Sequence, residues 1–244
     1  MHPKIGIITQ ARMTSTRLPG KVLLTAGNDS ILGHHVRRAQ QSGYAVYVAT
    51  TTNDTDQPIV AWCEQQKIAY YRGSETHVLS RYYACALAQQ LDIVVRITSD
   101  CPLIDGDLIR RGVAQYLSLG TDMGYVSNGL QRSFPRGFDL EVFSFALLSE
   151  AYHQATIAAD IEHVTPYIHQ NRNGKVQISH LLNDTDKSQY RITLDTPEDY
   201  QLLKILIEEH EAQHCSYSQI IALLDQYPAL AAINAHIEQK KLGE

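Results

Sequence analysis

The chain has 244 residues, 44% of them hydrophobic, and a formal net charge of −5. This length and composition suit one α/β domain over 1–244 with a full apolar core. The acidic balance argues against a nucleic-acid-binding face, and no apolar run approaches the roughly 20 residues of a membrane-spanning helix. The four cysteines lack CxxC spacing and the start of the chain shows no signal-peptide pattern, so we expect a cytoplasmic protein.

Strand and helix patterns alternate along the first half of the chain. Apolar runs predict strands at 4–9, 45–49, 69–72 and 93–98. Helical spacing and end signals predict helices at 30–42, 57–66, 78–90 and 107–119. This order indicates an α/β fold with a Rossmann-like, mostly parallel sheet and helices on both faces.

The pattern changes in the second half. Strands predicted at 124–128 and 140–143 flank a Gly-, Pro- and Arg-rich segment, which indicates a β-hairpin arm over about 123–145 and makes the sheet mixed. An extended arm of this kind often pairs with a second copy, so we expect a homodimer. The remaining predicted elements are helices at 144–154 and 160–169, a strand at 191–195, a helix opened by a capping box at Thr196, and a helical tail at 218–241 broken at Pro228.

The segment QARMTSTRLPGK, at 10–21, is the most informative part of the sequence. Its short side chains allow backbone N–H groups to approach phosphates, and Arg12, Arg17 and Lys21 supply three positive charges. A loop after the first strand is the usual phosphate-binding position in an open α/β sheet, although this one is neither a Walker loop nor a GxGxxG fingerprint. The predicted nucleotide contacts in the loop are Gln10, Ala11, Arg12, Thr14, Ser15, Arg17 and Lys21.

Asp100 and Asp195 each end a predicted strand. Because the C-terminal ends of parallel strands share one edge of a sheet, we expect both carboxylates to face the crevice above the loop. Such a pair is typical of a magnesium–nucleotide site, since Mg²⁺ takes one or two carboxylates and completes its shell with water and phosphate oxygens. The alternative for each acid is a cap on the turn or helix that follows it.

Polar residues at other strand ends are candidates for reading the base and the acceptor. The predicted base and ribose contacts are Thr50, Thr51, Arg72, Gly73 and Ser74, with a plain polar turn as the alternative at 50–51. The predicted sugar contacts are Asn128, Arg132, Arg136, Glu141 and His163. Arginine forks match a carboxylate, although an oligomer contact competes at 132 and 136 and helix packing competes at 163. Arg96, inside an apolar strand, needs an anionic partner, which is either a structural acid or the substrate.

Five stretches resemble, in order, the SpsF-type branch of the sugar cytidylyltransferases: QARMTSTRLPGKVL, YRGSETHVLSRYY, VVRITSDCPLID, FPRGFDLEVFS with EHVTPYI, and RITLDTPEDY. They cover most of the chain. The family is related to the enzymes that make CMP-KDO and CMP-sialic acid, forms dimers, and is similar in fold to GT-A-like nucleotide-diphospho-sugar transferases. The resemblance implies that the first loop holds the CTP phosphates and that Asp100 and Asp195 hold magnesium.

We therefore predict a Mg²⁺-dependent cytidylyltransferase that transfers CMP from CTP to an acidic or modified sugar and releases pyrophosphate, for surface polysaccharide synthesis. Lys21, Arg12 and Asp100 are its predicted catalytic residues, acting by positioning and charge neutralisation. Two alternatives stay open. One is a GT-A-like glycosyltransferase using a nucleotide sugar, although the sequence around Asp100 is not a DxD motif. The other is a non-catalytic nucleotide-binding protein.

Overall fold

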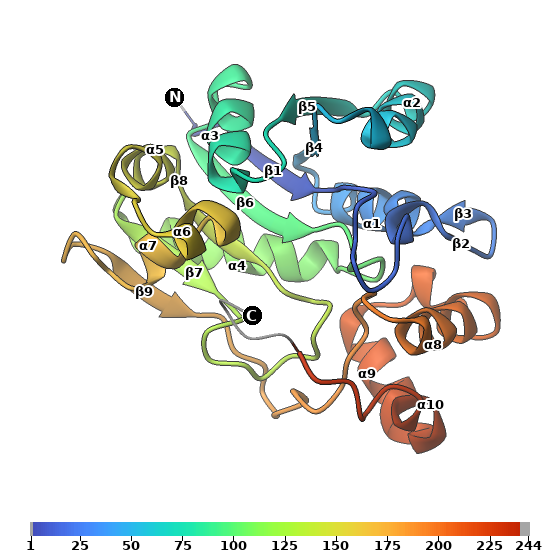
Figure 1. Ribbon diagram of the computed structural model, residues 1–244. Coiled ribbons are helices and arrows are strands. Elements are labelled where there is room, and N and C mark those ends of the chain that lie inside the picture. The colour runs from blue at the N-terminus through green and yellow to red at the C-terminus, as the bar shows by residue number, and fades with distance from the viewer. Residues whose placement is uncertain (1, 240–244) are drawn as a thin grey trace.

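The computed structural model describes residues 2–239 and is built on a seven-stranded sheet of order β5-β4-β1-β6-β8-β7-β9 (Figure 1). The strands are β1 (Ile5–Gln10), β4 (Ala45–Thr51), β5 (Ala69–Gly73), β6 (Ile93–Thr98), β7 (Gly124–Ser127), β8 (Glu141–Ser144) and β9 (Gln177–His180). Strand β8 pairs antiparallel with β6 and β7, and the other pairs are parallel. The predicted mostly parallel, mixed α/β sheet is confirmed.

Helices cover both faces of this sheet. The α-helices are α1 (Ile31–Gln40), α2 (Gln57–Gln66), α3 (Val78–Ala88), α4 (Gly106–Ser118), α5 (Phe145–Gln154), α6 (Ala158–His163), α7 (Pro166–His169), α8 (Pro197–Glu208), α9 (Tyr217–Gln226) and α10 (Pro228–Ala232). Shorter elements are the 3₁₀ turns Lys21–Leu23, Asp54–Asp56 and Ala212–His214 and the strands β2 (Thr25–Ala26) and β3 (Asp29–Ser30). Within the described residues, no helix is both long and apolar enough to cross a membrane.

The alternation of side chains along a strand divides the core into two layers. Ile7 of β1 packs in the layer that also holds buried residues of α1, α2, α4, α8 and α9. Its neighbour Ile8 packs in the layer formed with α3, α5 and α7. Both side chains are fully buried, as expected for a parallel strand covered on both faces.

Local end signals in the sequence identify helix starts correctly. Ser30 caps α1, because its Oγ accepts a hydrogen bond from Gly33 N at 3.0 Å. Thr196 caps α8, where its Oγ1 accepts from Asp199 N at 3.3 Å while the Asp199 carboxylate accepts from Thr196 N at 3.1 Å. The predicted capping box is therefore confirmed.

Three predicted elements differ from the structure. The helix expected at 160–169 is two short helices, α6 and α7, because Val164 between them has φ +74°. The strand expected at 191–195 is reduced to one parallel bridge between Arg136 and Arg191, while β9 joins the sheet edge without having been predicted. The tail helix expected at 218–241 is interrupted at Pro228, as predicted, but ends at Ala232; its residues 240–241 lie outside the described part of the chain.

The segment between β7 and β8 folds back onto the body instead of extending as an arm. Strands β7 and β8 do pair antiparallel, as predicted. Phe134 and Phe138, however, are fully buried in the main core, and Arg136 bridges to Arg191. The two phenylalanines of the segment therefore have partners within this chain. A role of the segment in a homodimer stays a prediction.

The turn at Gly137 allows that segment to approach residue 192, and its replacement should be costly. Gly137 has φ +109°, and a Cβ there would lie 2.7 Å from the backbone C and O of Ile192. Gly43 has φ +84° but nothing within 4 Å of an added Cβ. We expect Gly137→Ala to lower the free energy of unfolding by about 1–3 kcal/mol more than Gly43→Ala, because only the first adds a steric clash to backbone strain. Urea unfolding of both variants measures the difference, and equal losses would contradict the close packing.

Candidate active site

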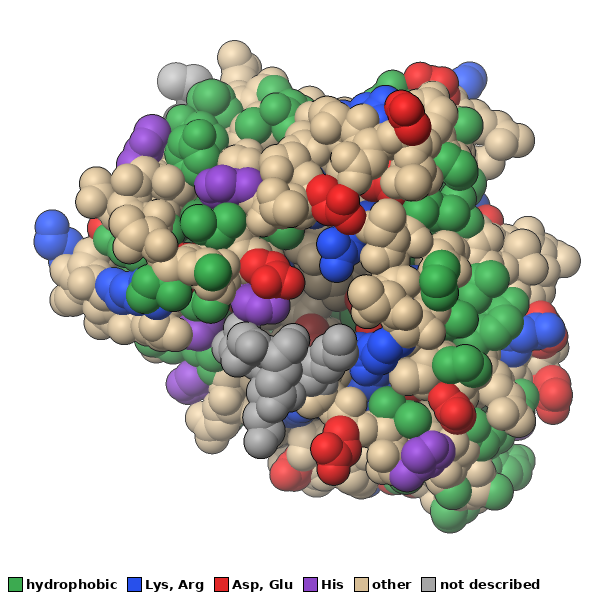
Figure 2. Space-filling model, in the orientation of Figure 1, with side chains coloured by type: hydrophobic (Ala, Val, Ile, Leu, Met, Phe, Trp, Pro, Cys, Tyr) green, Lys and Arg blue, Asp and Glu red, His purple; other side chains and the backbone are tan. Residues whose placement is uncertain are grey.

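A cavity of about 740 Å³ opens above the C-terminal ends of β1 and β6. It is lined by the loop that follows β1, by the start of α3, by the end of α6 and by Asp100 and Asp195. Figure 2 shows this face hollowed near its centre, with acidic and basic side chains around the opening. The position matches the crevice at the carboxyl edge of an open α/β sheet, where ligands of such folds usually bind.

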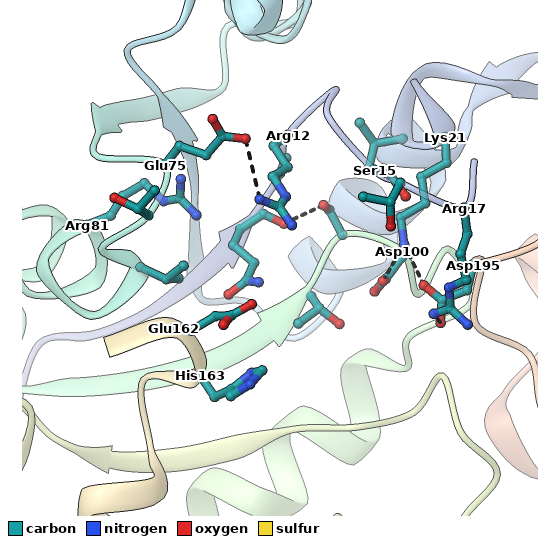
Figure 3. A pocket seen from close by; sticks show the side chains of 18 of the residues that line it. Arg12, Ser15, Arg17, Lys21, Glu75, Arg81, Asp100, Glu162, His163 and Asp195 are labelled. Carbon is teal, nitrogen blue, oxygen red and sulfur yellow. Dashed lines mark hydrogen bonds and ion pairs between the residues drawn. The ribbon is translucent and has the colours of Figure 1, made fainter. Parts of the chain in front are cut away.

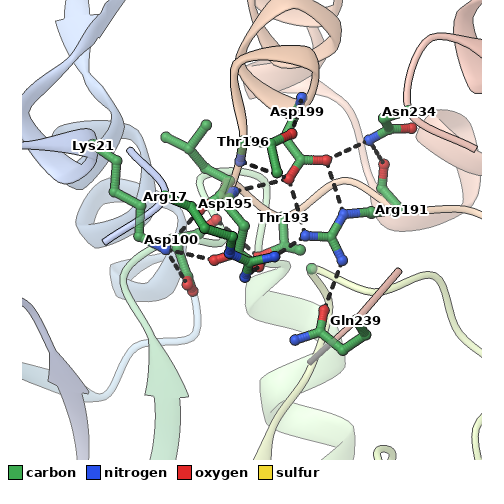
Figure 4. A network of polar contacts seen from close by, with 12 residues as sticks. Arg17, Lys21, Asp100, Arg191, Thr193, Asp195, Thr196, Asp199, Asn234 and Gln239 are labelled. Carbon is green, nitrogen blue, oxygen red and sulfur yellow. Dashed lines mark hydrogen bonds and ion pairs between the residues drawn. The ribbon is translucent and has the colours of Figure 1, made fainter. Parts of the chain in front are cut away.

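The ammonium group of Lys21 connects the two predicted acids. Lys21 Nζ donates to Asp100 Oδ2 at 2.8 Å, to Asp195 Oδ1 at 2.8 Å and to the Leu194 carbonyl at 2.7 Å (Figure 4). Burial opposes the charged form of Lys21, but the two carboxylates outweigh it and raise its pKa. Burial likewise opposes ionisation of Asp100, but Lys21 outweighs it and lowers the Asp100 pKa to about 2. The three charged groups therefore hold one another in place.

Asp195 reaches this site from a bend instead of a strand end. Arg17 Nη2 lies 2.9 Å from Asp195 Oδ2, and Arg191 Nη2 donates to the same oxygen at 2.8 Å. Asp199, buried at the start of α8, accepts from Arg191 Nε at 2.8 Å and from Asp195 N at 2.9 Å. The prediction that Asp100 and Asp195 converge is thus confirmed, although the strand from which it was argued is absent from the described sheet.

The C-terminal segment completes this network. Asn234 Nδ2 donates to Asp199 Oδ1 at 2.8 Å and to the Arg191 carbonyl at 3.0 Å. Arg191 Nη1 donates to Gln239 Oε1 at 2.7 Å, and Gln239 also lines the cavity (Figure 4). A buried arginine needs close anionic and polar partners. The turn that carries Asp195 is therefore fixed by residues that lie some forty positions further along the chain.

The arrangement of Asp100 and Asp195 fits a divalent cation. One oxygen of each carboxylate already contacts a single positively charged atom, Lys21 Nζ. Among residues 2–239 no group of three or more His, Cys, Asp or Glu side chains could hold a metal. Two carboxylates with phosphate oxygens and water are, however, a donor set that Mg²⁺ accepts.

The loop after β1 presents its cations along one wall of the cavity. Arg12, Arg17 and Lys21 all line it, together with the predicted residues Gln10, Ala11 and Ser15. Each cation has an acidic partner: Arg12 Nη1 lies 3.4 Å from Glu75 Oε1, and Arg17 and Lys21 contact Asp195. Thr14 does not line the cavity, although it was predicted to contact the nucleotide, and its hydroxyl donates to Glu75.

The predicted base contacts are placed differently by the structure. Thr50 and Thr51 are fully buried and donate to Asp56 Oδ2, at 3.3 and 2.5 Å, so their side chains do not face a ligand. Arg72 donates to the carbonyls of Thr51 and Asn53, which ties β5 to the preceding loop. These strand-end residues are used to build the scaffold.

Glu75 and Thr76, just beyond them, line the cavity, whereas Gly73 and Ser74, which were also predicted to contact the base, do not. Gly73 packs its Cα beside the Arg81 side chain, and Ser74 Oγ accepts a hydrogen bond from His77 N before α3 begins. The polar lining residues that sequence reasoning missed are Thr16, Glu75, Thr76, Arg81, Thr98, Ser99, Glu162 and Gln239. One signal was available, because the single charge within the otherwise uncharged helix sequence VLSRYYACALA is Arg81.

Of the predicted sugar contacts, His163 lines the main cavity. It lies at the end of α6 beside Glu162, facing the loop after β1 across the cavity (Figure 3). The backbone makes a tight reversal directly after it, where Thr165 N donates to the His163 carbonyl at 2.8 Å around Val164. A positive φ at a buried β-branched residue is strained, and such strain is common at functional sites.

The other predicted sugar contacts lie outside that cavity. Asn128 is buried and bonds the backbone of Phe138 and Leu140, and Arg132 pairs with Asp139. Both side chains are therefore structural in this state. Arg136 lies in the segment between β7 and β8, half-buried beside the bridge to residue 191.

Glu141 lines a second cavity, of about 170 Å³, which shares Thr98 with the first. It accepts hydrogen bonds from Arg96, Tyr125 and Thr165, so the structural ion pair is the correct interpretation for Arg96. The small cavity lies over β6, β7 and β8, next to the site formed by Lys21 and the two acids.

Two sequence relatives support the family. The spore coat polysaccharide biosynthesis protein SpsF of Bacillus subtilis is 34% identical over 236 residues, covering 93% of this chain and 96% of that protein. A 3-deoxy-manno-octulosonate cytidylyltransferase of Solibacter usitatus is 37% identical over 108 residues, which is 43% of this chain and 42% of that protein.

Solved structures agree with the fold. A cytidylyltransferase from Leptospira borgpetersenii superposes with a TM-score of 0.88 at 33% identity, covering 98% of this chain and all of that chain. A CMP:2-keto-3-deoxy-manno-octonic acid synthetase complexed with CTP gives a TM-score of 0.61 at 16% identity, covering 85% and 99%, which shows a shared fold. The cytidylyltransferase family model matches residues 6–241 of this chain. The chain therefore belongs to the cytidylyltransferase family.

Proposed function

We propose that this protein transfers CMP from CTP to a hydroxyl group of an acidic or modified sugar, with Mg²⁺ as cofactor, in the synthesis of a surface polysaccharide. The observation that carries the proposal is Lys21 Nζ held between Asp100 and Asp195 at one end of a loop with two further cations. The choice of CTP and of a sugar acceptor is supported by the relatives named for octulosonate cytidylyl transfer and spore coat polysaccharide synthesis.

Binding of the triphosphate would exchange ionic partners. Arg17 and Lys21 contact carboxylates in this state, and phosphate oxygens are competing anions with a higher charge density. When the phosphates take these cations, the carboxylates of Asp100 and Asp195 lose their positively charged partners. Both could then bind a metal ion in the space between them. Mg²⁺ bound there would withdraw negative charge from the phosphates.

The reaction needs no protein nucleophile. The sugar hydroxyl oxygen forms a bond to the α-phosphorus, the bond from that phosphorus to the bridging oxygen breaks, and pyrophosphate leaves with the electron pair. Lys21 and Arg12 neutralise the charge that grows on the leaving group. His163 and Glu162 lie across the cavity from the phosphate loop, where the acceptor would enter, and are suited to accept or hold the hydroxyl proton (Figure 3).

The first test addresses the lysine. Lys21→Ala should reduce turnover by about a hundredfold or more, because it removes a charge that stabilises the leaving pyrophosphate. The control is Lys204→Ala on the exposed side of α8, which removes the same charge away from the cavity. Pyrophosphate release with CTP and a panel of sugar acids measures the effect, and near-normal turnover of Lys21→Ala would disprove the role.

The second test addresses the metal. Asp100→Asn and Asp195→Asn should each weaken Mg²⁺ binding, measured by calorimetry with a non-hydrolysable CTP analogue present, by about tenfold or more. The physical reason is that a neutral amide is a poorer ligand than a carboxylate for a hard cation. Asp225→Asn, on an exposed ion pair with Lys187, is the matched control. If either site variant keeps the metal affinity of the wild type, that aspartate is only a structural partner of Lys21.

The third test uses pH and needs no substrate. Because the pKa of Asp100 is lowered to about 2 in the folded state, its ion pair contributes stability above the unfolded pKa, and this contribution is lost as pH falls toward 2. We expect wild-type stability to fall by about 2 kcal/mol more than that of Asp100→Asn between about pH 5 and pH 2. Urea unfolding across this range, with Asp54→Asn as the exposed control, measures the change; parallel pH curves would contradict the ion pair.

A further inference from the structure

The turn that joins α6 to α7 has a strained backbone directly beside the cavity. Val164 has φ +74° and ψ −51°, and Thr165 N donates to the His163 carbonyl at 2.8 Å across it. These dihedral angles and this hydrogen bond are those of the rare, strained kind of γ-turn. Val164 is also β-branched and fully buried, and such a conformation persists only where the surrounding structure holds it. A contact close to this turn must therefore stabilise it.

The hydroxyl of Thr165 supplies such a contact. Thr165 is 3% exposed, and its Oγ1 donates to Glu141 Oε1 of β8 at 2.6 Å. Thr165 also stands at the N-cap of α7, where a threonine hydroxyl usually accepts from a backbone N–H of the first helical turn. Within the described residues this hydroxyl makes no capping bond of that kind. The structure uses it instead to tie the turn to the sheet.

Glu141 is a well-fixed acceptor for that hydrogen bond. Its Oε2 pairs with Arg96 of β6, and its Oε1 also accepts from the Tyr125 hydroxyl of β7. Burial opposes ionisation of Glu141, but Arg96 outweighs it and lowers the pKa of this carboxyl, so the carboxylate stays charged. Strand β8 lies between β6 and β7 in the sheet. The acceptor used by Thr165 is therefore held by three neighbouring strands.

The first turn of α6 is held by a second buried acid. Asp160 is fully buried and pairs with Arg172. This helix of six residues is thus fixed near its start by Asp160 and just beyond its end by the bond from Thr165 to Glu141. His163 is its last residue and lines the main cavity (Figure 3). The contacts on either side of the helix therefore set where His163 lies.

We propose that Thr165, anchored by Glu141, is a positioning residue that directs the His163 imidazole toward the acceptor hydroxyl. The inference rests on the proposed cytidylyl transfer and names what sets the acceptor side of its site. Residues 163 and 165 flank the γ-turn, so the bond from Thr165 fixes the direction in which the backbone leaves His163. A group that accepts a proton must lie within hydrogen-bond reach of it. The described residues that line the main cavity include neither Thr165 nor Glu141, so both act through His163.

Two variants at position 165 isolate the hydroxyl. Thr165→Val keeps the shape of the side chain and removes the donor, whereas Thr165→Ser keeps the donor. With CTP and a sugar acid, Thr165→Val should lower kcat by about tenfold to a hundredfold with little change in KM for CTP, because the misplaced group lies on the acceptor side. Thr165→Ser should retain most of the wild-type kcat. The matched control is Thr9→Val in β1, because Thr9 is fully buried and its hydroxyl has no hydrogen-bond partner among residues 2–239.

A double-mutant cycle separates positioning from a general loss of structure. In a His163→Ala background, Thr165→Val should change kcat by less than about twofold, because the group that Thr165 positions is already gone. Equal losses in the two backgrounds, or wild-type turnover of His163→Ala itself, would contradict the proposal. Should Thr165→Val lose its thermal unfolding transition, Thr165→Ala takes its place in the cycle with the same expected results.

A measurement without substrate distinguishes this proposal from the proposed function. The His163 Cε1–H signal in the proton NMR spectrum is identified as the one that His163→Ala lacks. It should shift in Thr165→Val and stay near its wild-type position in Thr165→Ser and Thr9→Val, because only the first loses the bond to Glu141. An unchanged signal in Thr165→Val overturns the positioning role even if the enzyme is active. A wild type that releases no pyrophosphate from CTP with any sugar acid overturns the proposed function, and with it the catalytic purpose given to His163.

Discussion

The ion triad of Lys21, Asp100 and Asp195 is the interaction on which the rest of the site depends. It joins three segments that are far apart in sequence: the loop after β1, the end of β6 and the turn before α8. Each partner is less than a quarter exposed, so none of the charges is stable there without the others. The positions of the loop after β1 and of the two acids are therefore set by one shared electrostatic requirement, which is met when the sheet and the C-terminal helices are assembled around it.

The strand and helix order could be predicted because its signals are local. The apolar run of β6 and the caps at Ser30 and Thr196 are encoded within a few residues, and they match the structure. The course of 191–195 depends instead on distant partners. Arg191 bonds Asp199, Asn234 and Gln239, and these contacts hold the segment out of the sheet. Hydrogen bonds between residues so far apart in the sequence produce no periodic pattern of apolar residues from which they could be predicted.

Site residues could be predicted from the sequence where their chemistry had few structural uses. They could not be predicted where a structural role and a ligand contact were equally plausible. Three cations in a polar loop after the first strand have few structural uses, and all of them line the cavity. Hydroxyls at a strand end have many uses, and in this protein Thr50 and Thr51 satisfy the buried Asp56. The arginines between β7 and β8 were equally ambiguous: Arg132 neutralises Asp139 within the same segment. In such cases, only the residue that each side chain contacts in the folded structure shows whether it supports the scaffold or is free to contact a ligand.

The pairing of loop cations with carboxylates has a consequence for the proposed reaction. Arg17 and Lys21 are already oriented by acids, so a triphosphate would replace one anionic partner with another and would not need to order flexible side chains from water. Asp195 would keep its place during that exchange, because Arg191 and the backbone contact to Asp199 would still hold it after Arg17 and Lys21 leave. In the proposed reaction, the buried pair of Arg191 and Asp199 would allow one carboxylate to give up two cations and still face the place where a metal would bind.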